Sequence, residues 1–513
     1  MSSAAGAHLN VDVLLDVLAL SDNPTICRLM QSSRELYHEG PKFLLRRGVR
    51  LKKVSSVSSF VAFMKAEHPY RFQFLKRLHI STGCLPPSDA RMLERFLLEN
   101  ESHFDIRRLT VDHAEEFFDS SPGLSGAFAT LHTITDLTMS EIGRRASLFL
   151  ERSRSKLISA NLSMVMRPLP ADSEDSDDDD YDDDAFDATI RNPILQLHNS
   201  QDTLRKLSVE WADTDCDLDV LYKERYPNVK TLTLSSNELP YTMHYARAYP
   251  NLSELTLDVA TRELAELGTD IDSFVEHRYV NKLEQMQHGT WERLKAVHGT
   301  LIDHFLLGLL CEVEQIHING NFMDKRMFRS VLSTTRPKYV NFQGFDVDLF
   351  FDGEFRRLMR GPLLAPVRCF EIMIFFGGML QPEAVDVPKA LDALIQGISQ
   401  TSITSFGVTL CCFGLQAELG KRKPKGQVNL CPAEQYLQEL NFDELAVRIR
   451  EAVPTLKTVT ISLIGHSTRE NGFGVYGDDV DYHPDAVESL PLWHAATITH
   501  FKIPPFLNKL PFF

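Results

Sequence analysis

The sequence predicts an α/β protein in which a short N-terminal three-helix unit, residues 1–50, precedes a solenoid of repeated strand–helix units over residues 51–513. Three observations lead to this prediction. Capping signals divide the first fifty residues into three short helices. A six-residue apolar motif then recurs ten times along the chain. Apolar residues make up 43% and charged residues 24% of the sequence, which is typical of a globular protein and excludes a wholly disordered or collagen-like chain.

The first fifty residues carry the helix signals. Asn10 can cap a helix whose apolar positions recur at intervals of three and four residues. Asn23-Pro24 starts a second helix, and Gly40-Pro41 opens a third over residues 42–47, before a short strand over residues 49–51. Three such helices bury too little apolar surface to be stable alone, so we expect them to pack against the next domain, a partner or both.

The recurring motif reads apolar, polar, polar, apolar, polar, apolar. Composition alone would produce about three copies in a chain of this length. Residues 89–99, 388–399 and 441–452 resemble helices between the copies. A strand followed by a helix, repeated, stacks into a curved solenoid with its strands on the concave face; the alternative is one mixed α/β domain with several edge strands. The ten copies begin at Leu75, Ile106, Ile134, Leu204, Val229, Leu252, Val313, Ile403, Leu456 and Ile498.

Two parts of the chain resemble known families. Residues Leu9–Leu18, with Ile26-Cys27-Arg28-Leu29-Met30 and Leu36-Tyr37, resemble an F-box in the version common in fungal F-box proteins. The copies that begin at Val229 and Val313 add an asparagine, Asn237 and Asn321, and fit the full leucine-rich-repeat pattern. The repeat part therefore resembles the irregular leucine-rich repeats that accompany an F-box.

The resemblance implies a substrate receptor of a Skp/cullin/F-box-type ubiquitin ligase, without chemistry of its own. Its N-terminal helices would bind a Skp-type adaptor, and through it a cullin, while the concave face would hold a target protein. The apolar face expected to dock the adaptor consists of Leu9, Val11, Leu14, Leu15, Leu18, Ile26, Leu29 and Met30.

The polar positions of the early motif copies are mostly basic. In this kind of repeat the polar residues of each strand point to the concave face, so we predict a basic patch on the N-terminal half of that face, suited to an acidic or phosphorylated segment of a substrate. The residues of this predicted substrate-binding patch are Lys76, Arg77, His79, Arg107, Arg108, Arg205, Lys206 and Lys230.

Residues 172–187 form a dense acidic run. It holds eleven Asp and Glu and no Lys or Arg, so it accounts for eleven of the sixteen net negative charges and leaves −5 for the rest of the chain. Like charges this dense repel one another, and we expect a disordered insertion within the solenoid. It is either an inert spacer or a competitor for the basic patch, in which case its deletion strengthens binding of an acidic peptide at low salt. The mildly acidic remainder excludes a general nucleic-acid binder.

Several classes of protein are excluded by absent signals. The N-terminus has no basic region of a signal peptide and no apolar run is long enough to span a membrane, so we expect a cytoplasmic or nuclear protein with no membrane partner. No HExxH, P-loop, nucleophile elbow or kinase motif occurs, which predicts a non-enzyme without cofactor or metal. Gly472–Gly477 spells GxGxxG in polar surroundings and predicts a flexible loop. The alternatives are a leucine-rich-repeat scaffold without a ubiquitin link and an α/β enzyme built from scattered residues.

Overall fold

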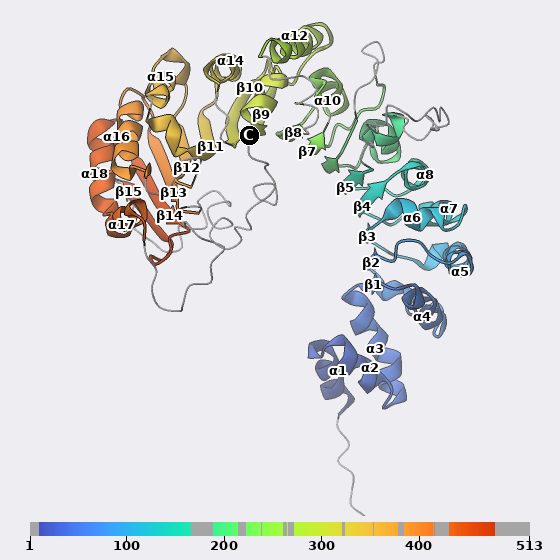
Figure 1. Cartoon of the computed structure of the whole chain (residues 1–513). Helices are drawn as coiled ribbons and strands as arrows, with labels where there is room; N and C mark the ends of the chain where they lie inside the picture. The colour runs from blue at the N-terminus through green and yellow to red at the C-terminus, as the bar shows by residue number, and fades with distance from the viewer. Residues whose placement is uncertain are drawn as a thin grey trace, which may run out of the picture. The chain divides into compact units, whose positions relative to one another are not determined.

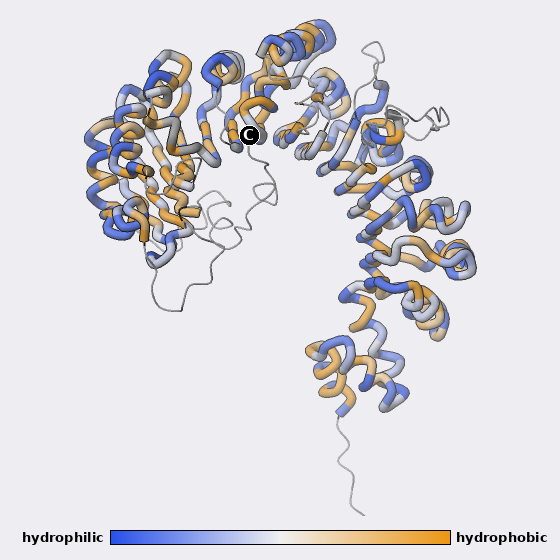
Figure 2. The backbone as a smooth tube through the Cα atoms, viewed as in Figure 1, coloured by the Kyte–Doolittle hydropathy of each residue, from blue (hydrophilic) through white to orange (hydrophobic). Residues whose placement is uncertain are grey.

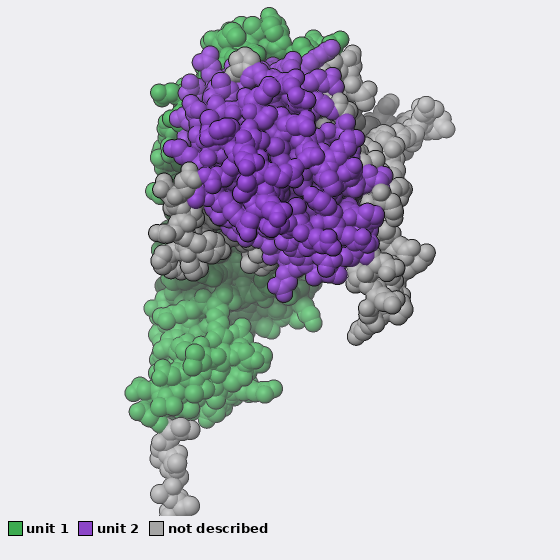
Figure 3. Space-filling view, turned by 90° about the vertical axis from the view of Figure 1, so that its left-hand side faces the viewer, with its two compact units in different colours: residues 1–311 green, residues 312–513 purple. Residues whose placement is uncertain are grey.

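The computed structural model is an α/β protein built from a mostly parallel sheet and helices. It describes residues 10–165, 188–213, 222–237, 239–259, 264, 271–320, 324–351, 353–377, 384–413, 415 and 430–477. Strand order in the sheet is the chain order, β1 to β15. The chain divides into two compact units, unit 1 over residues 1–311 and unit 2 over residues 312–513 (Figure 3). The repeating α/β architecture confirms the predicted fold class at this level; the leucine-rich-repeat assignment stays a prediction.

Unit 1 begins with three helices, α1 (Val11–Leu20), α2 (Asn23–Met30) and α3 (Arg34–Arg46). Asn10 caps α1 as expected, with its side chain accepting from the Asp12 backbone N–H at 3.1 Å. The cap of α2 is Asp22 rather than Asn23, because the Asp22 carboxylate accepts from the Thr25 N–H at 3.0 Å and Pro24 follows inside the first turn.

The predicted start of the third helix at Gly40-Pro41 is wrong. Ser33 caps α3, and Pro41 lies inside the helix. Gly40 is needed for a different reason, since a Cβ there would lie 2.3 Å from Met30 Cγ. The missing side chain lets α3 approach α2 closely.

The rest of unit 1 alternates strands with helices on one face of the sheet (Figure 1). The strands are β1 (Val49–Leu51), β2 (Arg77–Ile80), β3 (Arg108–Val111), β4 (Asp136–Ile142), β5 (Ser159–Met164), β6 (Lys206–Glu210), β7 (Thr231–Asn237), β8 (Glu254–Val259) and β9 (Arg293–Thr300). The described α-helices after β1 are α4 (Val54–Lys65), α5 (Pro87–Glu99), α6 (Ala114–Asp119), α7 (Leu124–Ala129), α8 (Arg144–Arg152), α9 (Pro193–Gln196), α10 (Thr242–Ala248), α12 (Ile271–His288) and α13 (Leu301–Leu306), and a short 3-10 helix η1 (Phe72–Phe74) precedes β2.

Unit 2 continues the alternation and ends in an antiparallel strand. Its strands are β10 (Glu312–Asn319), β11 (Tyr339–Asp346), β12 (Cys369–Phe375), β13 (Ser405–Cys411), β14 (Thr458–Ile464) and β15 (Gly472–Gly477). Its helices are α14 (Lys325–Thr335), α15 (Glu354–Met359), α16 (Val387–Ile398), α17 (Pro432–Glu439) and α18 (Phe442–Ala452).

The GxGxxG segment is a strand, and its prediction as a flexible loop is wrong. β15 pairs antiparallel with β14 over six register positions, from Leu463 opposite Gly472 to Thr458 opposite Gly477. Pairing satisfies backbone groups that would otherwise be exposed at the edge of β14. A strand also lacks the turn into a helix that a dinucleotide site requires.

Many of the strands bury alternate residues against the helices. In β2, Leu78 and Ile80 are buried whereas Arg77 is exposed, and β12 alternates over its whole length. We call the opposite side of the sheet, which no described helix covers, the open face (Figures 1 and 2). The prediction places the polar positions of the motif on this side of the strands. The acidic run at 172–187, the motif copy at Ile498, Leu9 and Asn321 lie outside the described residues.

Candidate functional site

The three N-terminal helices have a small core of their own. Leu18, Ile26, Met30 and Leu36 are at most 6% exposed and form one cluster. Leu14, Leu15 and Leu29 are partly buried against that cluster, whereas Val11 is 43% exposed. The structure therefore brings most of the predicted adaptor-docking residues together, but as the interior of the three-helix unit. Their role in binding an adaptor stays a prediction.

Three exposed apolar side chains lie along the other side of α1. Val13, Val17 and Leu20 are 47%, 42% and 89% exposed. Their spacing of four and three residues places them in one stripe along the helix, here called the α1 stripe. Apart from Asp12 and Asp16, α1 is apolar all round (Figure 2). A helix of that kind is normally covered on every side, and this was the signal in the sequence that could have indicated the α1 stripe.

Polar and aromatic contacts fix the three-helix unit to the segment that follows it. The buried Arg71 guanidinium lies 4.2 Å from the Phe63 ring centroid and 5.0 Å from that of Tyr37 on α3. The Arg71 Nε donates to Glu67 at 2.9 Å, and the His38 ring of α3 contacts the same carboxylate at 3.0 Å. Burial opposes ionisation of Glu67, but hydrogen bonds from His38 and Arg71 lower its pKa. These contacts attach α3, which packs against α1, to the segment that follows the three-helix unit.

The predicted basic patch occupies two different positions. Arg77, His79, Arg108 and Lys206 lie within strands, on the open face. Lys76, Arg107, Arg205 and Lys230 immediately precede their strands instead. Their backbone groups form hydrogen bonds with one another at the start of the strands. The Arg107 N–H donates to the Lys76 carbonyl and the Lys230 N–H to the Arg205 carbonyl, both at 2.9 Å. The expectation that all eight lie within strands on the concave face is therefore wrong for these four.

Acidic neighbours neutralise part of the patch. Asp105 pairs with Lys76 and, at 2.6 Å, with Arg107 Nε. Burial acts to raise the pKa of Asp105, but the hydrogen bond and charge of Lys76 and the charge of Arg107 lower it. His79 Nε2 lies 2.7 Å from an Asp112 oxygen.

What remains of the patch is split along the sheet. Arg77 and Arg108 are register neighbours, and no ion pair to either occurs among the described residues. Lys206 lies three strands from Arg108, beyond Asp136 and Ser159 in the same register row. With about 4.8 Å between strands, that is roughly 14 Å. Arg77 and Arg108 are therefore close enough to bind the same acidic side chain, whereas Lys206 is not.

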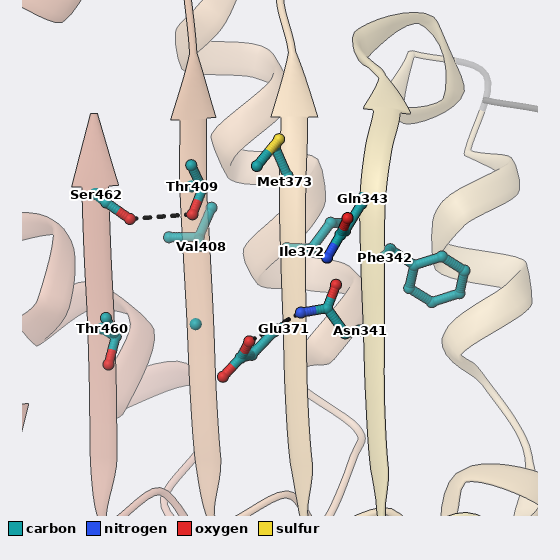
Figure 4. Close-up of a pocket in the computed structure, with 11 residues that line it drawn as sticks. Asn341, Phe342, Gln343, Glu371, Ile372, Met373, Val408, Thr409, Thr460 and Ser462 are labelled. Atoms are coloured by element: carbon teal, nitrogen blue, oxygen red, sulfur yellow. Dashed lines mark hydrogen bonds between the residues drawn. The ribbon is translucent and has the colours of Figure 1, made fainter. Parts of the chain in front are cut away.

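A second candidate site lies on the open face of unit 2 and was missed by the sequence analysis. Asn341, Glu371, Gly407 and Thr460 occupy one register row across β11 to β14. They line a shallow hollow together with Thr409 and other residues of the same strands (Figure 4). We call this the Glu371 hollow. The volume of this hollow that is open to the centre of a water-sized sphere is about 20 Å³.

Hydrogen bonds orient the polar groups around the Glu371 hollow. The Tyr339 hydroxyl donates to Glu371 Oε2 at 2.6 Å, and Asn341 Nδ2 donates to the same oxygen at 3.0 Å. Burial first, and then the Glu371 charge, raise the pKa of Tyr339, so its hydroxyl stays protonated as a donor. Thr409 and Ser462 hydroxyls lie 3.0 Å apart on the neighbouring strands. Among the described residues, these hydrogen bonds hold the Glu371 carboxylate in a fixed position beside neutral polar side chains.

Comparisons with known proteins do not identify a family. No family model matches the chain, and no curated protein matches its sequence. Within the described part of the chain, no three His, Cys, Asp or Glu side chains are grouped as metal ligands. None of the described helices is long and apolar enough to cross a membrane.

Proposed function

We propose that this protein is the substrate-recognition subunit of a Skp/cullin/F-box-type ubiquitin ligase, in which the N-terminal helices bind a Skp-type adaptor and the open face binds a target protein. The observation that supports this function best is the α1 stripe. Val13, Val17 and Leu20 are exposed on a helix that packs its opposite face, through Leu14, Leu15 and Leu18, against the core of the three-helix unit. Exposed apolar groups side by side on a fixed support are typical of a protein interface.

In this proposal the repeats provide a binding surface for the target protein and no catalytic residues. The strands of each unit present successive polar rows on the open face. Such rows suit recognition of an extended segment, because neighbouring strands repeat the same position about every 4.8 Å. Ubiquitin transfer would be performed by the other subunits of the ligase.

A scaffold without a ubiquitin link is the second candidate. The burial of Leu18, Ile26 and Met30 within the three-helix unit favours it, because these side chains already have partners. In this case the helices only cover the first strands of unit 1. The two functions differ in one testable respect, which is adaptor binding.

Co-expression with a Skp-type adaptor tests the proposal. The full chain is compared with a variant carrying Val13→Asp, Val17→Asp and Leu20→Asp, and complex formation is measured by size-exclusion chromatography with light scattering. Each added carboxylate would lose water in an interface without gaining a partner, so we expect at least a hundredfold loss of affinity. These side chains are exposed, so the folded state should tolerate the changes, unlike changes at the partly buried Leu14 and Leu15.

Val447→Asp is the matched control, since Val447 is 55% exposed on α18 in unit 2. It should bind the adaptor as the unchanged chain does. Circular dichroism verifies that all three proteins are folded. If the folded unchanged chain forms no complex, the scaffold function replaces the ligase function.

A further inference from the structure

The 18-residue helix α12 is attached to unit 1 mainly through polar side chains. Its Asn281 amide nitrogen donates to the Pro240 and Leu306 carbonyls at 2.7 and 2.8 Å. Gln285 Nε2 donates to the Leu307 carbonyl at 3.2 Å. Such bonds satisfy backbone groups that would otherwise be buried without a partner. Apart from Phe274, the buried side chains that the structure describes in α12 are polar and belong to His277, Arg278, Asn281 and Gln285.

The exposed side of α12 is apolar instead. Val275, Tyr279 and Met286 are 47%, 60% and 66% exposed. Together with Lys282 they recur at intervals of four, three and four residues, which places all four on one side of the helix. We call these four residues the α12 stripe. A surface helix normally has the reverse arrangement, with apolar side chains inward and polar ones outward, so packing within unit 1 does not explain the α12 stripe.

The spacing of the α12 stripe is that of positions a and d in a coiled coil. Tyr279 and Met286 take position a, and Val275 and Lys282 take position d. The pairs Val275–Met286 and Tyr279–Lys282 are both centred between residues 280 and 281. A copy of α12 that lies antiparallel about this centre therefore sets Met286 against Val275 and Tyr279 against Lys282.

Lys282 favours the antiparallel arrangement over the parallel one. Two parallel copies would set Lys282 against Lys282, and like charges that face each other repel. In the antiparallel pair the Lys282 ammonium instead meets the ring of Tyr279, which attracts a cation. No ion pair to Lys282 occurs among the residues that the structure describes, so the ammonium group is not held by a carboxylate within unit 1.

We propose that the α12 stripe binds the α12 stripe of a second copy of this chain, with the two helices antiparallel. The stripe complements itself, as a two-fold symmetric interface requires. It lies on the helix-covered side of the sheet (Figure 1), so the open face stays accessible in the dimer. One helix from each copy buries less than the roughly 1,200 Å² of a tight complex, and we expect a dissociation constant on the order of 10–100 µM. This inference does not depend on the proposed function.

Sedimentation equilibrium of the full chain, without any adaptor, tests the dimer. We expect the mean mass to rise from that of one chain toward that of two as the concentration increases through about 100 µM. Val275→Asp combined with Met286→Asp sets two carboxylates against each other at both ends of the helix pair. This variant should dimerise at least about a hundredfold more weakly. Both residues are exposed, so the folded state should tolerate the changes, and circular dichroism verifies it.

A second variant tests the antiparallel orientation. Val275→Asp combined with Met286→Lys sets each new aspartate against a new lysine of the other copy. We expect it to dimerise at least about tenfold more tightly than the variant with two aspartates. The two positions are three helical turns apart, so they do not contact each other within one helix. In a parallel pair the same variant would set aspartate against aspartate and lysine against lysine.

Leu98→Asp combined with Val447→Asp is the matched control. Leu98 and Val447 are 48% and 55% exposed on α5 and α18, so the control adds the same charge outside α12. It should dimerise as the unchanged chain does.

The proposal is overturned if the unchanged chain stays monomeric up to about 500 µM, well above the expected dissociation constant; the α12 stripe would then be left for a helix of a different protein. It is equally overturned if the variant with two aspartates dimerises as tightly as the unchanged chain, or if the control loses as much affinity. A variant with aspartate and lysine that gains nothing over two aspartates overturns the antiparallel pair. None of these outcomes involves the adaptor, so the proposed function is tested separately.

Discussion

The two units use equivalent register rows for different side chains. On the helix-covered side, unit 1 repeats leucine, as in Leu78, Leu109 and Leu137, which are paired neighbours on β2 to β4. In unit 2 the corresponding row has Phe370 beside Phe406, with their rings 6.1 Å apart and nearly parallel. Both rows are almost completely buried. The same backbone alternation thus accepts either a leucine row or an aromatic one.

The open faces differ in charge. In unit 1 one register row carries Arg77, Arg108 and Lys206, with Asp136 between them. In unit 2 the described row from Asn341 to Thr460 carries neutral polar residues beside the Glu371 carboxylate. Because the buried side fixes the backbone, the open side is free to vary. We therefore expect substitutions on the two sides of one strand to differ: stability should depend on the buried row and ligand choice on the open row.

The largest effect should come from the buried aromatic row. Phe370→Ala removes a fully buried ring that packs against Phe406 and Phe342, so we expect the free energy of unfolding to fall by about 3–5 kcal/mol. Met373→Ala, on the open side of the same strand, should cost about 1 kcal/mol or less. Urea unfolding followed by circular dichroism measures both. Equal losses would contradict the division between the two faces.

A smaller effect concerns a buried carboxyl group in unit 1. Asp303, at the start of α13, is 1% exposed, and burial raises its pKa to about 7 although the Thr300 and Val259 N–H groups donate to it. In the unfolded chain its pKa is near 3.8. Between about pH 4 and 7 the folded state therefore holds a proton that the unfolded state releases, and raising the pH favours unfolding. The protonated Asp303 carboxyl contributes at most about 4 kcal/mol to the free energy of unfolding. This contribution is fully present below about pH 4 and is lost as the pH rises to about 7.

Asp303→Asn separates this contribution from those of other groups. The variant has no titrating proton at position 303. We therefore expect it to be more stable at pH 7, relative to its own stability at pH 5, than the unchanged chain is. Urea unfolding at the two pH values measures it. An identical pH dependence in both proteins would show that Asp303 does not titrate in this range.

Much of the fold of unit 1 could be predicted because its buried row is leucine. All motif copies from Leu75 to Leu252 correspond to strands, and the asparagine cap of α1 was correct. In unit 2 the motif missed β11 and β12. β11 has Pro337 where the motif requires its first apolar residue, and in β12 Cys369 occupies a position reserved for polar residues. Both strands still bury their expected positions, Val340 and Phe370.

The sites were less predictable than the strands because they depend on neighbours distant in sequence. Asn341, Glu371 and Gly407 are about thirty residues apart from one to the next and meet only through register. The neutralisation of Lys76 and Arg107 depends on Asp105, which precedes β3 and has no place in the motif. For the N-terminal helices, periodicity identified an apolar face of α1, but it could not indicate that this face would form the interior of the unit.

The smallest effect should come from charge on the open face of unit 1. Arg77 and Arg108 are adjacent like charges, which an acidic segment would relieve. Changing both to Glu should weaken binding of a fluorescent poly-aspartate peptide about tenfold at low salt, with a difference that shrinks as salt rises. Fluorescence anisotropy measures the affinity. The control, Arg91→Glu with Arg152→Glu, makes the same charge change on the exposed surfaces of α5 and α8. If that control loses as much affinity, the peptide responds to net charge alone, and the open face of unit 1 has no local preference for an acidic ligand.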